Sequence, residues 1–90
     1  MFKVNKWNYG EYSSNNYGVH TLGFTDNNGN DFYFSYETLV AFRHNGKLYV
    51  HSNKWGNTTG KHLNLIDGGN KKERLNDEEF KQKYVECFNK

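Results

Sequence analysis

The dipeptide Asn45-Gly46 is the feature that most restricts how this chain can fold. Both residues accept positive φ, and this pair at the centre of a two-residue loop is typical of a tight β-hairpin. The segments on either side, 38–44 and 47–51, alternate as two antiparallel strands do. The loop sets their register and predicts four opposing pairs: Arg43 with Leu48, Phe42 with Tyr49, Ala41 with Val50, and Val40 with His51.

This register also predicts what each face of the hairpin carries, because successive side chains of a strand point to opposite faces. One face carries small and aliphatic residues, namely Leu39, Ala41, Leu48 and Val50. The other face carries Val40, Phe42, Tyr49 and His51. Both faces are apolar enough to lie inside a folded domain.

Further strands are predicted before the hairpin, over 2–7, 19–25 and 31–36. The run 26–30 contains Asn28-Gly29 and is a predicted turn. Residues 52–61 form a polar segment with two glycines, and 62–66 are predicted as a last short strand. The run 67–70, with two more glycines, is a further predicted turn.

The end of the chain, over 75–89, has the pattern of a helix. Asn76 is a good N-cap, and Glu79 three residues later suits a capping box. Phe80, Tyr84 and Phe88 repeat every four residues, with Cys87 beside them, and form one apolar stripe. We therefore predict one α+β domain over 1–90, with a β-rich part over 1–70. Its twisted, mostly antiparallel sheet has about five strands, and the C-terminal helix packs on one face.

A single helix covers a single face of such a sheet. The small residues Leu39, Ala41 and Val50 suit contact with a helix, so the aromatic face would stay partly open. An exposed apolar and aromatic patch usually marks a contact site. Homodimerisation through Val40, Phe42 and Tyr49 is one predicted way to close it, since two-fold pairing is the commonest assembly.

Composition places the chain among folded proteins of a reducing compartment. Aromatic residues make up 18% of the 90 residues, far more than solvated chains carry. Cys87 is the only cysteine, so no intramolecular disulfide is expected, which fits the cytoplasm. The longest apolar run, 39–42, is too short for a membrane span, and no contact with a membrane is expected.

The stretch 38–66 contains no carboxylate and indicates a binding surface. It carries four basic side chains, three histidines and the aromatic residues Tyr49 and Trp55. With Phe42 from the aromatic face, the candidate binding residues are Phe42, Arg43, His44, Lys47, Tyr49, His51, Lys54, Trp55, Lys61 and His62. One alternative is a single-strand nucleic-acid-binding module, in which the cations contact phosphates and Tyr49, Trp55 or Phe42 stack on bases.

Catalytic interpretations find less support in the sequence. The run 56–62 resembles the end of a phosphate-binding loop, but only three residues separate its glycines and His62 replaces the required Ser or Thr. The histidine spacings of seven and eleven match no metal-ligand pattern, so no metal or cofactor is expected. A low-weight alternative is a metal-independent ribonuclease, with His51, His62 and Lys61 in acid–base roles. We expect a non-enzymatic protein.

Longer motifs connect the chain to known proteins. It carries the runs YFSYETLVAF over 33–42, WGNTTGKHLN over 55–64 and IDGG over 66–69, with YSSNNYG over 12–18. These motifs resemble a family of small, uncharacterised domains from bacteriophages and mobile elements. The resemblance implies an accessory protein, in the cytoplasm of a bacterial host, that binds and blocks a host or defence protein. A nuclease complex is the partner expected for an inhibitor of the anti-CRISPR type.

Overall fold

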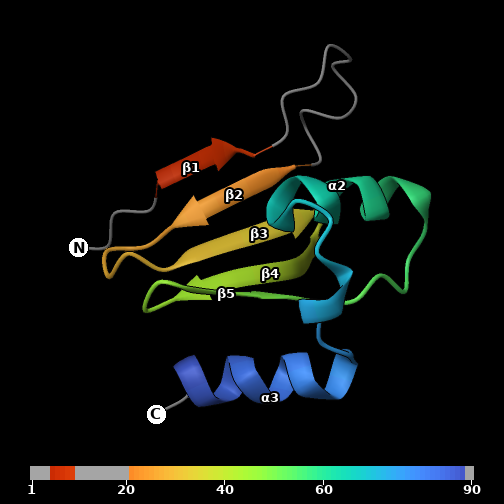
Figure 1. Cartoon of the computed structure of the whole chain (residues 1–90). Helices are drawn as coiled ribbons and strands as arrows, with labels where there is room; N and C mark the ends of the chain where they lie inside the picture. The colour runs from red at the N-terminus through yellow and green to blue at the C-terminus, as the bar shows by residue number, and fades with distance from the viewer. Residues whose placement is uncertain (1–4, 10–20, 89–90) are drawn as a thin grey trace.

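One antiparallel sheet followed by helices makes up the described part of the molecule (Figure 1). The computed structural model describes residues 5–9 and 21–88, and for 5–8 only the backbone. The strands lie in the sheet in the order in which they occur along the chain. They are β1 (Asn5–Asn8), β2 (Leu22–Thr25), β3 (Asp31–Ser35), β4 (Thr38–His44) and β5 (Lys47–Val50). The predicted α+β class and antiparallel pairing are confirmed.

The Asn45-Gly46 hairpin forms as predicted. Asn45 and Gly46 have φ values of 52° and 79°, as a two-residue hairpin loop requires. The structure pairs Ala41 with Val50, Phe42 with Tyr49 and Arg43 with Leu48. Next to the Ala41–Val50 pair, on the side away from the loop, the His51 amide donates to the Val40 carbonyl at 2.9 Å. The loop residues therefore determine the register of this pair of strands.

The prediction of a single helix is wrong. Within the described residues, α2 (Asn57–Asp67) and α3 (Asp77–Phe88) follow the sheet, with the short 3-10 turn η1 (Lys71–Glu73) between them. The segment 57–67 was expected to be a loop and a short strand. Its buried residues Thr59, His62 and Leu63 instead have helical spacing, and Gly68 ends the helix at a φ of 69°. None of the described helices is long and apolar enough to cross a bilayer.

The two helices pack against different faces of the sheet. Leu63 of α2 joins a core cluster with Tyr33, Val40, Ala41 and Val50. On the α3 side, the Phe42 ring lies 5.3 Å from Phe80, 5.5 Å from Tyr84 and 5.4 Å from Phe88. The predicted assignment of faces is therefore reversed. The large rings of α3 need the aromatic face to interdigitate, while Leu63 fits beside the small Ala41.

A register shift in β4 changes which residues share a face. Tyr33 pairs with Ala41, but the next residue, Phe34, pairs with Leu39, so Val40 is an extra residue in β4. Strict alternation ends at this bulge. Val40 consequently packs with Ala41 in the α2-side cluster, whereas Leu39 lies near Phe80 on the α3 side. The predicted grouping of Leu39 with Ala41, and of Val40 with Phe42, is wrong for this reason.

The start of α3 is attached to the end of β5. The Leu75 amide donates to the Val50 carbonyl at 2.8 Å, and the Ser52 amide donates to the Leu75 carbonyl at 2.7 Å. The predicted capping box is confirmed. The Glu79 amide donates to Asn76 Oδ1 at 2.9 Å, and the Asn76 amide donates to Glu79 Oε1 at 3.1 Å. Residue 89 of the predicted helix, residues 2–4 and 19–20 of two predicted strands and the motif over 12–18 lie outside the described residues.

Candidate functional site

The candidate residues from the acid-free stretch do not form one surface. Phe42 and His62 are fully buried, Phe42 under α3 and His62 under α2. His62 Nδ1 lies 2.7 Å from Ser35 Oγ. Arg43 and His44 contact neighbouring strands and turns: Arg43 Nε lies 3.5 Å from Asp31 Oδ2, and His44 Nδ1 lies 2.9 Å from Asn30 Oδ1. Of the face predicted to be open, Val40 and Phe42 are fully buried and Tyr49 is half-buried, so the predicted open patch is not formed.

His51 and His62 do not converge. His51 follows Val50 at the end of β5 and stacks on Phe80 of α3, with ring centroids 5.0 Å apart. His62 lies on the α2 side of the sheet, where the fully buried ring cannot reach a substrate. The two-histidine arrangement that a ribonuclease of the predicted kind requires is therefore not formed.

An apolar hollow of about 450 Å³ lies between α3, the start of β4 and the loop after β5. We call it the aromatic groove. Its lining residues are Thr38, Leu39, His51, Lys54, Trp55, Asp77, Phe80, Lys81, Tyr84 and Val85. Three large apolar side chains around it remain in contact with solvent, with exposed fractions of 38% for Trp55, 37% for Tyr84 and 49% for Val85. The structure thus brings His51, Lys54 and Trp55 of the predicted set together.

Asp77, in the first turn of α3, contacts the basic side chains at the rim of this groove. Its Oδ1 lies 2.9 Å from Lys54 Nζ and 3.0 Å from His51 Nε2, and its Oδ2 lies 3.2 Å from Lys81 Nζ. Hydrogen bonds from Lys54, His51 and Lys81 hold the pKa of the Asp77 carboxyl far below its usual value. Lys54 of the acid-free stretch therefore meets a carboxylate of α3 that lies 23 residues later in the chain.

His51 has a positioning role at this rim. Its Nδ1 lies 2.6 Å from the Ser52 carbonyl oxygen, and its Nε2 lies 3.0 Å from Asp77 Oδ1. The Trp55 ring lies 4.8 Å from the His51 ring, and Lys54 Nζ lies 5.5 Å from the Trp55 centroid. Because both ring nitrogens are engaged, His51 fixes the loop against α3 and supports Trp55.

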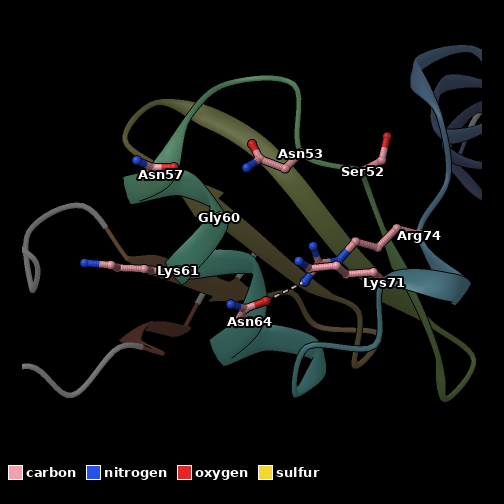
Figure 2. A pocket seen from close by; sticks show the side chains of 8 residues that line it. All are labelled: Ser52, Asn53, Asn57, Gly60, Lys61, Asn64, Lys71 and Arg74. Carbon is pink, nitrogen blue, oxygen red and sulfur yellow. Dashed lines mark hydrogen bonds between the residues drawn. The ribbon is translucent and has the colours of Figure 1, made fainter.

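A second hollow, of about 630 Å³, lies on the outer side of α2 and is polar. We call it the basic groove. Its lining residues are Ser52, Asn53, Asn57, Gly60, Lys61, Asn64, Lys71 and Arg74. Figure 2 shows Arg74 pointing toward α2, where the dashed line marks its hydrogen bond to Asn64, and Lys61 extending away from Arg74. Of the predicted binding residues, only Lys61 lies here.

The loop that separates the two grooves is shaped by Asn53. Its Oδ1 accepts hydrogen bonds from the amides of Trp55 and Gly56, and its Nδ2 donates to the Gly56 carbonyl at 3.0 Å. A Cβ added at Gly60 of α2 would lie 2.9 Å from Asn53 Nδ2, so a larger residue at position 60 would require the Asn53 side chain to shift. These hydrogen bonds of Asn53 thus hold the loop so that Trp55 lines the aromatic groove and Asn53 lines the basic groove.

The described part of the chain offers no set of side chains that could bind a metal ion. Among residues 5–9 and 21–88, no three of the His, Cys, Asp and Glu side chains gather as ligands. Cys87 lies half-buried on α3.

The sequence interpretation missed most of the residues that line both grooves. The sequence pattern assigns Tyr84 to the core stripe of α3 and gives Val85, Lys81 and Asp77 no place in a binding site. Val85 directly follows Tyr84, so the sequence does contain a signal that the apolar stripe of α3 is wider than Phe80, Tyr84 and Phe88. No local signal indicates Lys71 and Arg74, because their place depends on where the segment before α3 crosses α2.

Comparison with known proteins gives the chain a family. No curated protein and no solved structure matches it. A family model matches residues 4–82, which include both helical segments that line the grooves up to the middle of α3. The chain therefore belongs to DUF8033, a family of unknown function.

Proposed function

We propose that this chain is a non-enzymatic module that binds another protein through the aromatic groove. The observation that supports this most is the exposure of Trp55, Tyr84 and Val85 around one hollow. Large apolar side chains that gather at the surface of a small domain usually mark a contact site. Trp and Tyr are also the residues that most often contribute binding energy at protein interfaces.

The rim of the groove favours a partner with acidic groups. Lys54 and Lys81 share the single carboxylate of Asp77, so positive charge remains in excess among the groove residues. An apolar side chain of the partner would fill the hollow over Leu39 and Phe80, and a carboxylate beside it would meet the two ammonium groups. Such complementary charges increase association rates and select against basic partners.

The biological setting follows the resemblance stated above. We propose a phage-type accessory protein, in the cytoplasm of a bacterial host, whose partner is a host or defence protein. A nuclease complex of a defence system fits this setting. Binding and blocking such a component needs a stable contact surface and no catalytic group.

Single-strand nucleic acid is a weaker candidate for this surface. Stacking would need Tyr49 or Trp55 beside free cations. Lys47 Nζ lies 5.3 Å from the Tyr49 ring centroid at the hairpin, and Lys54 is paired with Asp77 beside Trp55. The cation beside Trp55 thus already has a carboxylate partner, and Lys61 lies at the other groove.

The test is capture of a partner from a bacterial lysate, followed by affinity measurement with the purified partner. Serine substitutions at Trp55 and Tyr84 together should weaken binding at least about thirtyfold, as loss of an interface hot spot does. Leu65→Ser is the matched control, because Leu65 is 45% exposed on α2 and lines neither groove. A partner that binds the double variant as tightly as the wild type would place the contact elsewhere. Recovery of no stoichiometric partner would contradict the proposed function.

A further inference from the structure

We infer that the basic groove is a second, independent binding site, and that it takes phosphate groups. The groove is built on one face of α2. Asn57, Gly60, Lys61 and Asn64 follow one another at helical spacing and line it, while Thr59, His62 and Leu63 on the opposite face are buried. Gly60, without a side chain, lets the Asn53 side chain lie against the middle of this face.

Hydrogen-bond donors dominate the groove. None of its eight lining residues is a carboxylate. The ammonium groups of Lys61 and Lys71 have no ion-pair partner among residues 5–9 and 21–88. The Nδ2 atoms of Asn57 and Asn64 are further donors of the same surface. A site with many donors and few acceptors suits an anion with several acceptor oxygens.

Arg74 forms a fixed floor for such an anion. Its side chain is only 4% exposed, and Nε donates to Asp67 Oδ2 at 2.8 Å. Nη2 donates to Asp67 Oδ1 at 2.9 Å and to Asn64 Oδ1 at 3.0 Å. Nη1 makes no hydrogen bond to another described side chain or backbone group. A guanidinium held in this way retains two N–H donors in a fixed orientation, which is the geometry that phosphate oxygens accept.

The shape and chemistry of the groove define the class of ligand. A volume of about 630 Å³ lies within the usual range of small-molecule sites and exceeds the size of a single phosphate. No aromatic side chain lines it, so it offers no platform for stacking a base. Recognition therefore rests on the phosphate groups, which a small molecule or the backbone of a nucleic-acid strand could carry.

Nuclear magnetic resonance titration with pyrophosphate, at constant ionic strength, tests this inference. We expect saturable shifts of the amides of Gly60, Lys61, Asn64 and Lys71. Lys61→Ala and Lys71→Ala should each weaken binding about fivefold, as for one ion-pair contact at a partly exposed site. Lys72→Ala is the matched control. It removes the same charge from the neighbouring residue of η1, which does not line the groove, and should change binding less than about twofold.

A ten-residue thymidine oligonucleotide identifies the source of the phosphate. If it displaces pyrophosphate and its affinity falls steeply with salt, the groove binds a strand. If it does not compete, the groove binds a small phosphorylated molecule. The inference is overturned if neither probe saturates, or if Lys72→Ala weakens binding as much as Lys71→Ala does. Intact amide spectra of the variants outside the groove show that they remain folded.

Discussion

The two faces of the sheet are closed in different ways. On the α2 face, Leu63 packs in a cluster with Tyr33 and small or aliphatic side chains, and Ser35 Oγ lies within hydrogen-bond distance of Thr59 Oγ1 and His62 Nδ1. On the α3 face, rings pack on rings around Phe42. On α2 the contact residues Thr59, His62 and Leu63 are buried, whereas on α3 the contact residue Tyr84 is more than one-third exposed.

This difference separates stability from binding within one small domain. α2 places the fully buried Leu63 in one cluster with the small Ala41. α3 packs the large rings of Phe80, Tyr84 and Phe88 against Phe42. The outer side of the Tyr84 ring remains accessible to solvent. The aromatic groove is therefore a consequence of how α3 closes its face.

The strongest test of this comparison is Phe42→Ala. Phe42 is fully buried and contacts the rings of Phe80, Tyr84, Phe88 and Tyr49, so we expect a loss of about 4 kcal/mol in the free energy of unfolding. Urea denaturation followed by circular dichroism measures it. Tyr84→Ala, at the exposed side of the same cluster, should cost less than about 2 kcal/mol. Equal losses would show that the two rings are equally important to the core.

A second prediction concerns the link between the two helical layers, where Asp67 at the end of α2 meets Arg74. Burial acts to raise the pKa of the Asp67 carboxyl, but hydrogen bonds from Arg74 and the Gly69 amide outweigh it and lower the pKa below 3.8. The ionised carboxylate therefore stabilises the folded state above that value. This contribution is lost as the pH falls through the lowered pKa.

Asp67→Asn should accordingly cost about 3 kcal/mol at pH 7, because it leaves a buried guanidinium without its charge partner. The difference from the wild type should shrink as the pH falls below 3.8 toward the lowered pKa of Asp67, because the wild-type carboxylate progressively loses its stabilising contribution. Urea unfolding at several pH values measures this. Glu86→Gln, which removes only the exposed contact with Lys83, serves as control and should change stability by less than about 0.5 kcal/mol. A constant difference at all pH values would contradict the prediction.

The smallest expected effect separates how the two helices begin. α3 has a side-chain cap at Asn76, whereas α2 begins after Gly56 without one. Asn76→Ala should therefore lower stability by about 1 kcal/mol and increase hydrogen exchange at the first turn of α3. Asn57→Ala in the first turn of α2 provides the comparison and should leave stability nearly unchanged. If both substitutions cost the same, capping does not distinguish the helices.

Features that depend on adjacent residues could be predicted from the sequence. The Asn45-Gly46 loop, the register of its strands and the Asn76/Glu79 capping box each rest on a few neighbouring residues with strong backbone preferences. The α2 helix could not be recognised with the same rules. Its first four residues, over 57–60, are Asn, Thr, Thr and Gly, which are typical of a loop. Its helical spacing is carried only by Thr59, His62, Leu63 and the half-buried Ile66.

The site depended on information that local patterns do not contain. One extra residue at Val40 reverses the faces on which Leu39 and Val40 lie, and strict alternation gives no indication of it. The absence of carboxylates over 38–66 suggested free cations, yet Asp77 approaches Lys54 from 23 residues away. Contacts between segments that are distant in the sequence therefore determine which predicted residues meet. His51, Lys54 and Trp55 share the aromatic groove, and Lys61 lies at the basic groove.

The attachment of Leu75 to β5 also affects how separate molecules meet. β5 is the last strand of the sheet, and an edge strand presents backbone groups that another chain can pair with. Hydrogen bonds between Leu75 and both Val50 and Ser52 already occupy the final part of that edge. The remaining part begins at Lys47, whose ammonium lies over the Tyr49 ring. A strand from a second molecule would meet a charge at one end and Leu75 at the other, so the fold itself limits edge-to-edge aggregation.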